Sequence, residues 1–131
     1  MKRFSLILLI FLSVILVFGF SCSLMMNKEM EKTKNELVQL ESPDLTRVQD
    51  GKYKGNKNTP LVKVEVEVDI KNHTITSITI LKHDNGRGKS AETIVDDIVR
   101  NNSLDVELIS GATISSLVIR AAVIDAFYCG V

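Results

Sequence analysis

Residues 62–70 read Val-Lys-Val-Glu-Val-Glu-Val-Asp-Ile, so apolar and charged side chains alternate throughout the stretch. A period of two with β-branched residues on one side is typical of a strand that buries one face. Residues 74–81 form a second run rich in β-branched residues, and Lys71-Asn72-His73 between the two runs has the composition of a turn. The two runs therefore predict an antiparallel hairpin.

The second run is not a regular strand. Ile75 falls on one face of a strict alternation, whereas Ile78 and Ile80 fall on the other. One extra residue would return all three side chains to the same face, so we predict a bulge or twist near Ser77.

Downstream of the hairpin, residues 91–100 predict a helix for which Ser90 can act as the cap. Its apolar positions repeat at helical spacing and form one stripe, which we interpret as core: Ile94, Val95, Ile98 and Val99. Asn101-Asn102-Ser103 then ends the helix. Residues 104–108 alternate Leu, Val and Leu with two acidic residues and predict a short third strand.

The next segment, residues 110–116, reads Ser-Gly-Ala-Thr-Ile-Ser-Ser and leads into the mostly apolar run 117–127. We predict a loop that feeds a helix, because Gly111 permits unusual backbone angles and hydroxyl side chains can cap a helix start. Unpaired N–H groups and the helix dipole would also suit a phosphate. From these residues alone, capping and phosphate binding both remain open.

The loop at residues 83–89 contains His83, Arg87 and Lys89 together with two glycines. Its backbone and cations can approach an anionic or polar-ringed ligand, or it is an ordinary turn with solvated charges. His83 has no second histidine and no acidic cluster at ligand spacing, so no metal site is predicted.

In sum, residues 50–127 predict the order strand, strand, helix, strand, helix. This order indicates an α+β domain in which two helices cover a small antiparallel sheet, the hairpin plus a third strand. We assign residues 50–131 to the domain, residues 23–49 to a polar tether, and residues 1–22 to a signal or anchor segment.

The N-terminal segment has a basic start followed by the apolar run 4–20 and then Ser21-Cys22. It resembles a bacterial lipoprotein signal, in which the cysteine is lipidated and becomes the new N-terminus. An uncleaved membrane anchor and an incidental cysteine are the alternatives. Lipidation and anchoring both place the remaining chain outside the cytoplasmic membrane of a bacterial envelope.

Composition narrows the classes of function. The chain has 16 basic and 16 acidic residues, which gives no electrostatic signature of nucleic-acid binding. Its two cysteines are too few for a disulfide scaffold, and Cys129 is expected to be a part-buried or free thiol. There is no plausible catalytic triad, and no Gly-x-Gly-x-x-Gly fingerprint for a nicotinamide cofactor.

Taken together, these blocks resemble the FMN-binding domain family. The resemblance rests on residues 50–53 (Asp-Gly-Lys-Tyr), the strand pair, residues 82–92, and above all residues 107–116. Members include the C subunit of the sodium-translocating NADH:quinone reductase, the G subunit of the Rnf complex, and many short single-domain lipoproteins.

The resemblance implies that Thr113 carries covalent FMN through a phosphoester, which a separate flavin transferase installs from FAD with Mg²⁺. Ser115 is the runner-up acceptor. The family usually has Asp six residues before the modified threonine, as part of what the transferase recognises. This chain has Glu107 at that position. The expected cofactor-binding residues are Ser110, Gly111, Ala112, Thr113, Ser115, Ser116, His83, Arg87 and Lys89.

The resemblance also implies a membrane-tethered flavin electron carrier that works with extracytoplasmic redox partner proteins. We expect an electron-transfer protein more than a stand-alone enzyme, because the flavin and not a side chain carries the chemistry. Two alternatives remain open. One is a non-redox module that binds a ligand or a partner, and the other is an enzyme that reduces a small substrate at its flavin.

Overall fold

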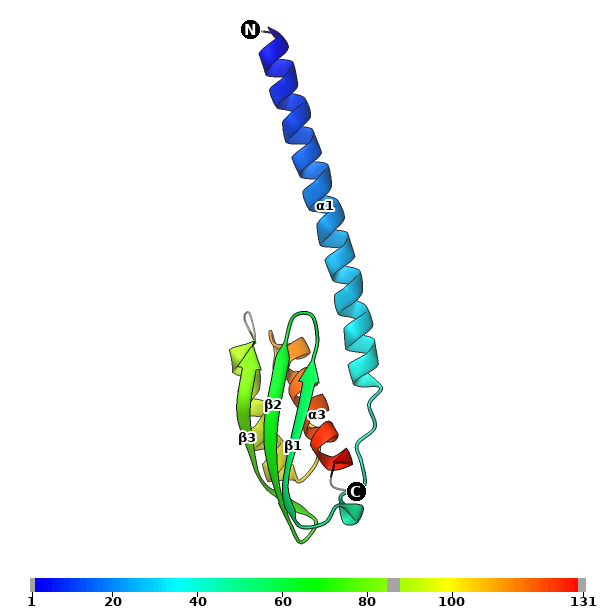
Figure 1. The fold of residues 1–131 in the computed structure, drawn as a ribbon, viewed down its shortest axis with the longest axis vertical. Coiled ribbons are helices and arrows are strands. Elements are labelled where there is room, and N and C mark those ends of the chain that lie inside the picture. The colour runs from blue at the N-terminus through cyan, green and yellow to red at the C-terminus, as the bar shows by residue number, and fades with distance from the viewer. Residues whose placement is uncertain (1, 85–87, 130–131) are drawn as a thin grey trace. The chain divides into compact units, whose positions relative to one another are not determined.

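The computed structural model describes residues 2–84 and 88–129 of the chain (Figure 1). The chain divides into two compact units, Met1–Asn35 and Glu36–Val131. The first unit is formed by α1 (Lys2–Val38), which continues into the beginning of the second. The second unit contains the sheet, the remaining helices and the core.

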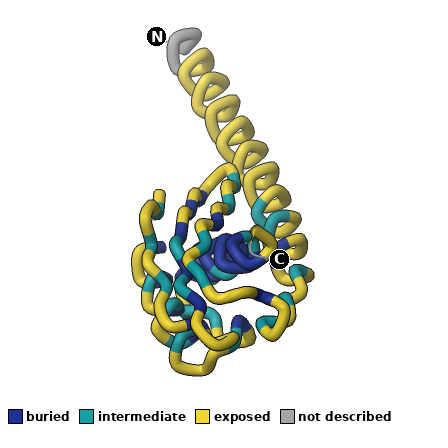
Figure 2. Tube along the Cα trace, turned by 60° about the horizontal axis from the view of Figure 1, so that its bottom comes forward, coloured by how far each residue is buried: buried dark blue, intermediate teal, exposed yellow. Residues whose placement is uncertain are grey.

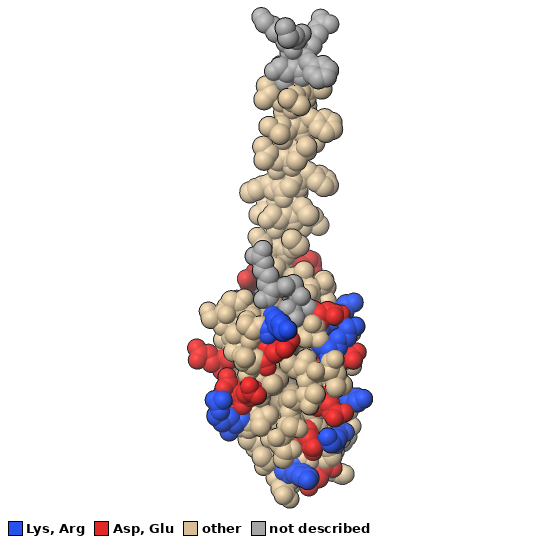
Figure 3. Space-filling view, turned by 90° about the vertical axis from the view of Figure 1, so that its left-hand side faces the viewer, with Lys and Arg blue, Asp and Glu red and all other residues tan. Residues whose placement is uncertain are grey.

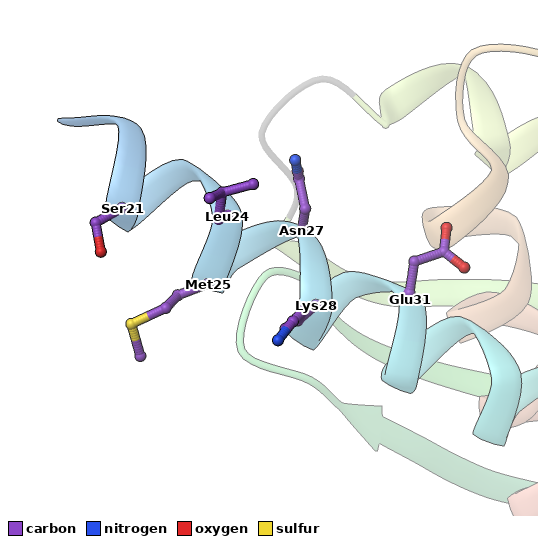
Figure 4. Close-up of a pocket in the computed structure, with 6 residues that line it drawn as sticks. All are labelled: Ser21, Leu24, Met25, Asn27, Lys28 and Glu31. Atoms are coloured by element: carbon purple, nitrogen blue, oxygen red, sulfur yellow. The ribbon is translucent and has the colours of Figure 1, made fainter. Parts of the chain in front are cut away.

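Helix α1 is long and apolar enough to cross a membrane over Leu6–Val38, by length and composition only, with a mean hydropathy of 2.7. Its apolar side chains between residues 6 and 20 are exposed. The helix is therefore compatible with either a membrane anchor or a signal sequence. Figure 4 shows a hollow along α1 whose described lining residues belong to that helix: Ser21, Leu24, Met25, Asn27, Lys28 and Glu31.

Part of the segment 23–49, which we assigned to a polar tether, is buried. Leu37 and Val48 are buried in the core of the second unit. Between them, η1 (Leu45–Arg47) is capped by Asp44, whose carboxylate accepts hydrogen bonds from the Thr46 N–H at 3.0 Å and the Thr46 hydroxyl at 2.7 Å. The segment before the sheet is thus part of the packed unit.

The sheet has three antiparallel strands in the order β1 (Gly51–Asn58), β2 (Lys63–Lys71) and β3 (Thr74–Asp84). The predicted hairpin is confirmed as β2–β3. Its two-residue loop, Asn72 and His73, has positive φ angles of 50° and 58°, as a type I′ turn requires.

The irregularity predicted near Ser77 is also confirmed. The pairing of β2 with β3 shifts register between Asp69 and Ile70, which leaves Thr76 as the extra residue on β3. This bulge brings Ile75, Ile78 and Ile80 opposite inward-facing residues of β2. A second shift leaves Leu81 as an extra residue. The hydrophobic pattern of β3 therefore required a break in its alternation.

The predicted position of the third strand was wrong. The third strand is β1, and residues 104–108 form an extended segment with no strand assignment. Leu104 is buried, and Val106 and Leu108 pack partly buried against the core. The alternation in this segment thus reflects one side lying on the core without pairing in the sheet.

The second half of the unit contains η2 (Lys89–Thr93), α2 (Ile94–Asn101) and α3 (Thr113–Tyr128). The predicted stripe is confirmed: Ile94 and Ile98 are fully buried, and the two valines beside them are partly buried. Ser90 is not the cap that we predicted, because η2 begins after Gly88 without a side-chain cap. Asn102 ends α2 in the left-handed conformation at φ 47°.

Helix α3 lies at the centre of the core. It packs against β1 and β2, while α2 packs against β3, so both helices cover the same face of the sheet. Figure 2 shows most of α3 as buried, which fits a helix that is apolar on nearly all sides. Its Arg120 donates to the Leu40 carbonyl at 3.3 Å, and its Asp125 accepts from the Asn56 N–H at 2.9 Å.

The opposite face of the sheet is exposed and charged. Lys52 of β1 forms ion pairs with Glu67 at 3.7 Å and Asp69 at 3.4 Å on β2. The face of the molecule in Figure 3 shows basic and acidic side chains interspersed. Mixed charge keeps this face solvated, and the strands need no covering layer there. The structure thus confirms a small α+β domain.

Candidate functional site

The hydroxyl-rich segment begins with a tight turn before α3. The Ala112 N–H donates to the Ile109 carbonyl at 3.0 Å and closes the turn around Ser110 and Gly111. Gly111 has φ 77°, a left-handed conformation that glycine adopts without steric cost. Ser110 and Gly111 are both exposed at this turn. The prediction of a loop that feeds a helix is therefore confirmed.

Of the two interpretations left open for these hydroxyls, side-chain capping is not the one that the structure shows. The N-cap residue of α3 is Ala112, which has no side-chain oxygen to accept a hydrogen bond. Among the described residues, no side chain accepts from the N–H groups of the first turn of α3. Such N–H groups, together with the helix dipole, favour an anion at this end of the helix.

The hydroxyl groups of the segment differ sharply in burial and bonding. Ser116 is fully buried, and its Oγ donates to the Ala112 carbonyl at 3.0 Å and accepts from the Ile109 N–H at 3.1 Å. Its only proton is thus committed within the protein. In this conformation Ser116 is therefore a structural residue. We had expected it to donate to a phosphate, but its proton is already donated to Ala112.

Thr113 is the first residue of α3 and is half-buried. Within residues 2–84 and 88–129, no group forms a hydrogen bond with its hydroxyl. Ser115 in the same helical turn is only 4% exposed, and its hydroxyl likewise has no partner among these residues. Each of these hydroxyls can therefore donate a hydrogen bond to a ligand atom.

There is free space beside the turn. A Cβ built on Gly111 would meet no heavy atom within 4 Å. The exposed side of the turn is therefore open to a second protein, and the unbonded Thr113 hydroxyl follows two residues later. Access is thus better for Thr113 than for Ser115, which is buried deeper in the helix.

The end of β3 and the helix η2 lie at the same end of the sheet as the start of α3 (Figure 1), and η2 packs against α3. His83 points inward opposite Val64 of β2, and its side chain is 2% exposed. Its Nδ1 lies 3.0 Å from Glu92 Oε1, so the ring connects β3 to η2. His83 is thus a buried link between β3 and η2, and its contact with the flavin stays a prediction.

The other charged residues predicted to act at this site have different outcomes. Lys89 is exposed at the start of η2, on an element that contacts α3. Arg87 lies outside the described residues. Glu107 is exposed on the extended segment before the turn, where a second protein can reach its carboxylate. The proposed roles of Lys89, Arg87 and Glu107 remain predictions.

The sequence profile of the FMN-binding domain matches residues 61–127, which is more than half of the chain. The chain belongs to the FMN-binding domain family. It is therefore a flavin-binding protein, and the resemblance stated from its sequence blocks is confirmed. A comparison with curated proteins gives no match.

The beginning of α3 in this FMN-binding domain suits the phosphate of FMN. It combines an uncapped helix start with the hydroxyls of Thr113 and Ser115, neither of which has a partner among the described residues. Lys89 adds a positive charge on the adjoining element. The residues of this chain therefore fit the group that the family binds.

Sequence reasoning missed two features that support this site. One is the hydrogen bond that the backbone N–H of Ile109 donates to the Ser116 Oγ. The other is Gly55 of β1, where an added Cβ would overlap the backbone of α3 at Ala122 and Ala126. The sequence did carry a signal for this contact, because alanines at helical spacing in α3 allow a strand to approach closely at a glycine.

Proposed function

We propose that this FMN-binding domain carries FMN covalently on Thr113 and serves as an extracytoplasmic electron carrier. The observation that supports this most strongly is the unbonded Thr113 hydroxyl at the start of an uncapped helix. It is half-buried next to an exposed turn, so a transferase can reach it. Once formed, a phosphoester there would keep its negative charge beside the helix N-terminus.

The attachment reaction is a phosphoryl transfer from FAD. The Thr113 Oγ attacks the phosphorus of the FMN half and forms the new P–O bond, while the pyrophosphate bond breaks and AMP leaves. The hydroxyl proton passes to a base of the flavin transferase, and Mg²⁺ bound by that enzyme offsets the phosphate charge. This chain supplies the acceptor hydroxyl and the shape of the segment that the transferase reads.

Within the domain, each residue of the site has a distinct task. The first-turn N–H groups of α3 hold the phosphate, Ser115 donates a hydrogen bond to it, and Lys89 offsets its charge. When bound, the flavin supplies the redox chemistry by accepting and donating electrons. Covalent attachment suits a domain outside the cytoplasm, because a dissociable cofactor would be diluted away there.

The location follows from the N-terminal segment. We propose cleavage before Cys22 and lipidation of its thiol, with an uncleaved α1 anchor as the alternative outcome. Either form keeps the second unit at the outer surface of the cytoplasmic membrane, where membrane-bound or extracytoplasmic redox proteins exchange electrons with it. Cys22 lies in α1 and is exposed and free, as a lipidation site must be.

The test is co-expression of the chain with a flavin transferase in an exporting host, followed by mass spectrometry of a tryptic digest. The peptide from Asn101 to Arg120 contains every hydroxyl of the segment. We expect a gain of one FMN less water on Thr113, with loss of the flavin in Thr113→Ala and its retention in Ser115→Ala. Modification of Ser115 in the wild type would contradict the assignment. An unmodified peptide beside a modified control protein would favour the non-redox binding module.

A further inference from the structure

The hydroxyl of Ser116 joins two parts of the chain. As a donor it bonds to the Ala112 carbonyl one helical turn earlier, at 3.0 Å. As an acceptor it receives the Ile109 N–H, seven residues upstream and outside the helix, at 3.1 Å. The first bond is common for serine in helices, whereas the second fixes the beginning of the turn to the body of α3.

Together with the backbone bond that closes the turn, these two bonds hold both of its ends. Ile109 is held by Ser116, and Ala112 closes the turn back onto the Ile109 carbonyl at 3.0 Å. Between these anchors lie the exposed Ser110 and Gly111, and Thr113 follows immediately. Since Gly111 has many accessible conformations, these bonds limit the conformations that the turn can adopt.

We infer that Ser116 is a positioning residue for the modification of Thr113. It holds the turn in the conformation that the transferase recognises, without touching the cofactor or the reacting atoms. This inference rests on the proposed covalent attachment at Thr113. It also explains why this serine lies fully buried in a mostly apolar helix.

The size and kind of the effect follow from this role. Loss of a hydrogen bond that orders a loop leaves the competent conformation only fractionally populated, and apparent affinity falls by that fraction. For one bond of this type we expect the KM of the transferase for the chain to rise about tenfold in Ser116→Ala. The kcat at saturation should stay within about twofold, because the bound conformation and the Thr113 hydroxyl are unchanged.

The experiment measures initial rates of flavin incorporation by purified transferase, with FAD and Mg²⁺, over a range of concentrations of the full chain in detergent. Ser116→Thr is the rescue variant, because a threonine hydroxyl can also bond to the carbonyl four residues earlier and accept from the Ile109 N–H. Ile124→Val is the matched control, a mild deletion in the buried part of α3 far from the turn. We expect Ser116→Thr and Ile124→Val to behave like the wild type.

Each other outcome overturns the inference. If Ser116→Ala and Ile124→Val both weaken incorporation equally, Ser116 contributes only to stability. If kcat falls while KM is unchanged, Ser116 acts in the chemical step. An unmodified wild type overturns the proposed attachment itself, whereas a modified wild type with an unaffected Ser116→Ala overturns only the positioning role. Should Ser116→Ala not fold, Ser116→Cys replaces it, because a thiol of similar size bonds more weakly.

Discussion

Gly55→Ala tests the packing that holds α3, and with it the flavin site, against the sheet. A Cβ at residue 55 would overlap the Ala122 carbonyl oxygen and the Ala126 nitrogen, and it would lie 2.8 Å from the Ala126 Cβ. Carbon atoms in contact prefer about 3.5–4.0 Å, so β1 and α3 would have to separate by about 1 Å. Two of the three clashing atoms belong to the backbone, so no side-chain rotation relieves the overlap.

The cost can be worked out from this geometry. A gap of about 1 Å forfeits up to about half of the dispersion energy along the contact. Overpacking usually costs about 1–3 kcal/mol, and rigid backbone contacts place Gly55→Ala at or above the upper end. For a unit of this size, about 3 kcal/mol corresponds to a fall in Tm of about 12–24 °C.

The assay is thermal unfolding of the full chain in detergent, followed by tyrosine fluorescence. Both tyrosines, Tyr53 and Tyr128, lie in the second unit, so the N-terminal helix does not contribute to the signal. Gly111→Ala is the control, because its added Cβ meets nothing within 4 Å and costs only the strain of φ 77°, about 1–2 kcal/mol. A Tm for Gly55→Ala equal to or above that of Gly111→Ala would refute the packing argument.

Two further substitutions and one labelling experiment have defined outcomes. Glu107→Asp should be flavinylated at least as fast as the wild type, since aspartate is usual there in the family, and a clear slowdown in initial rate would contradict this. Hydrogen bonds from the Thr46 hydroxyl and N–H hold the pKa of Asp44 below its ordinary value of 3.8. Because the folded pKa is lowered, the η1 cap contributes fully above that value and is lost as the pH falls through the folded pKa. A carboxyl titration by NMR should therefore show a midpoint that rises in Thr46→Val, and an unchanged midpoint would exclude this cause. Cys22 and Cys129 are both free in the unprocessed chain. Thiol labelling of the denatured mature protein should modify Cys129 alone if Cys22 is lipidated, and two labels per chain would indicate an uncleaved anchor.

The hairpin and α2 were predictable because their residues repeat at the period of their own element. The valines of β2 and the isoleucines of α2 each form one buried face. Even the bulge at Thr76 was visible, as a break in the alternation of β3. Where one face of an element is buried by side chains alone, the sequence reports it directly.

The third strand could not be found in this way. Strand β1 reads Gly-Lys-Tyr-Lys-Gly-Asn-Lys-Asn and has almost no apolar alternation. At its closest approach to α3 the strand needs Gly55, because even a methyl group would overlap the helix. Residues 104–108 show the converse case, since their alternation comes from contact with the core and not from pairing. Periodicity reports which side of a segment is buried, whereas strand pairing is decided by backbone partners elsewhere in the chain.

At the candidate site, the sequence predicted which residues gather but not how they divide the work. Four hydroxyl groups within seven positions looked equivalent as phosphate ligands. The structure separates them by burial: Ser110 is exposed, Thr113 is half-buried and unbonded, and Ser116 is fully buried and bonded twice. A residue that must be modified by another enzyme needs a reachable hydroxyl on a segment of fixed shape. Under the proposed attachment, Thr113 offers the reachable hydroxyl and Ser116 holds the segment in shape, so the proposal uses two hydroxyl groups with opposite environments.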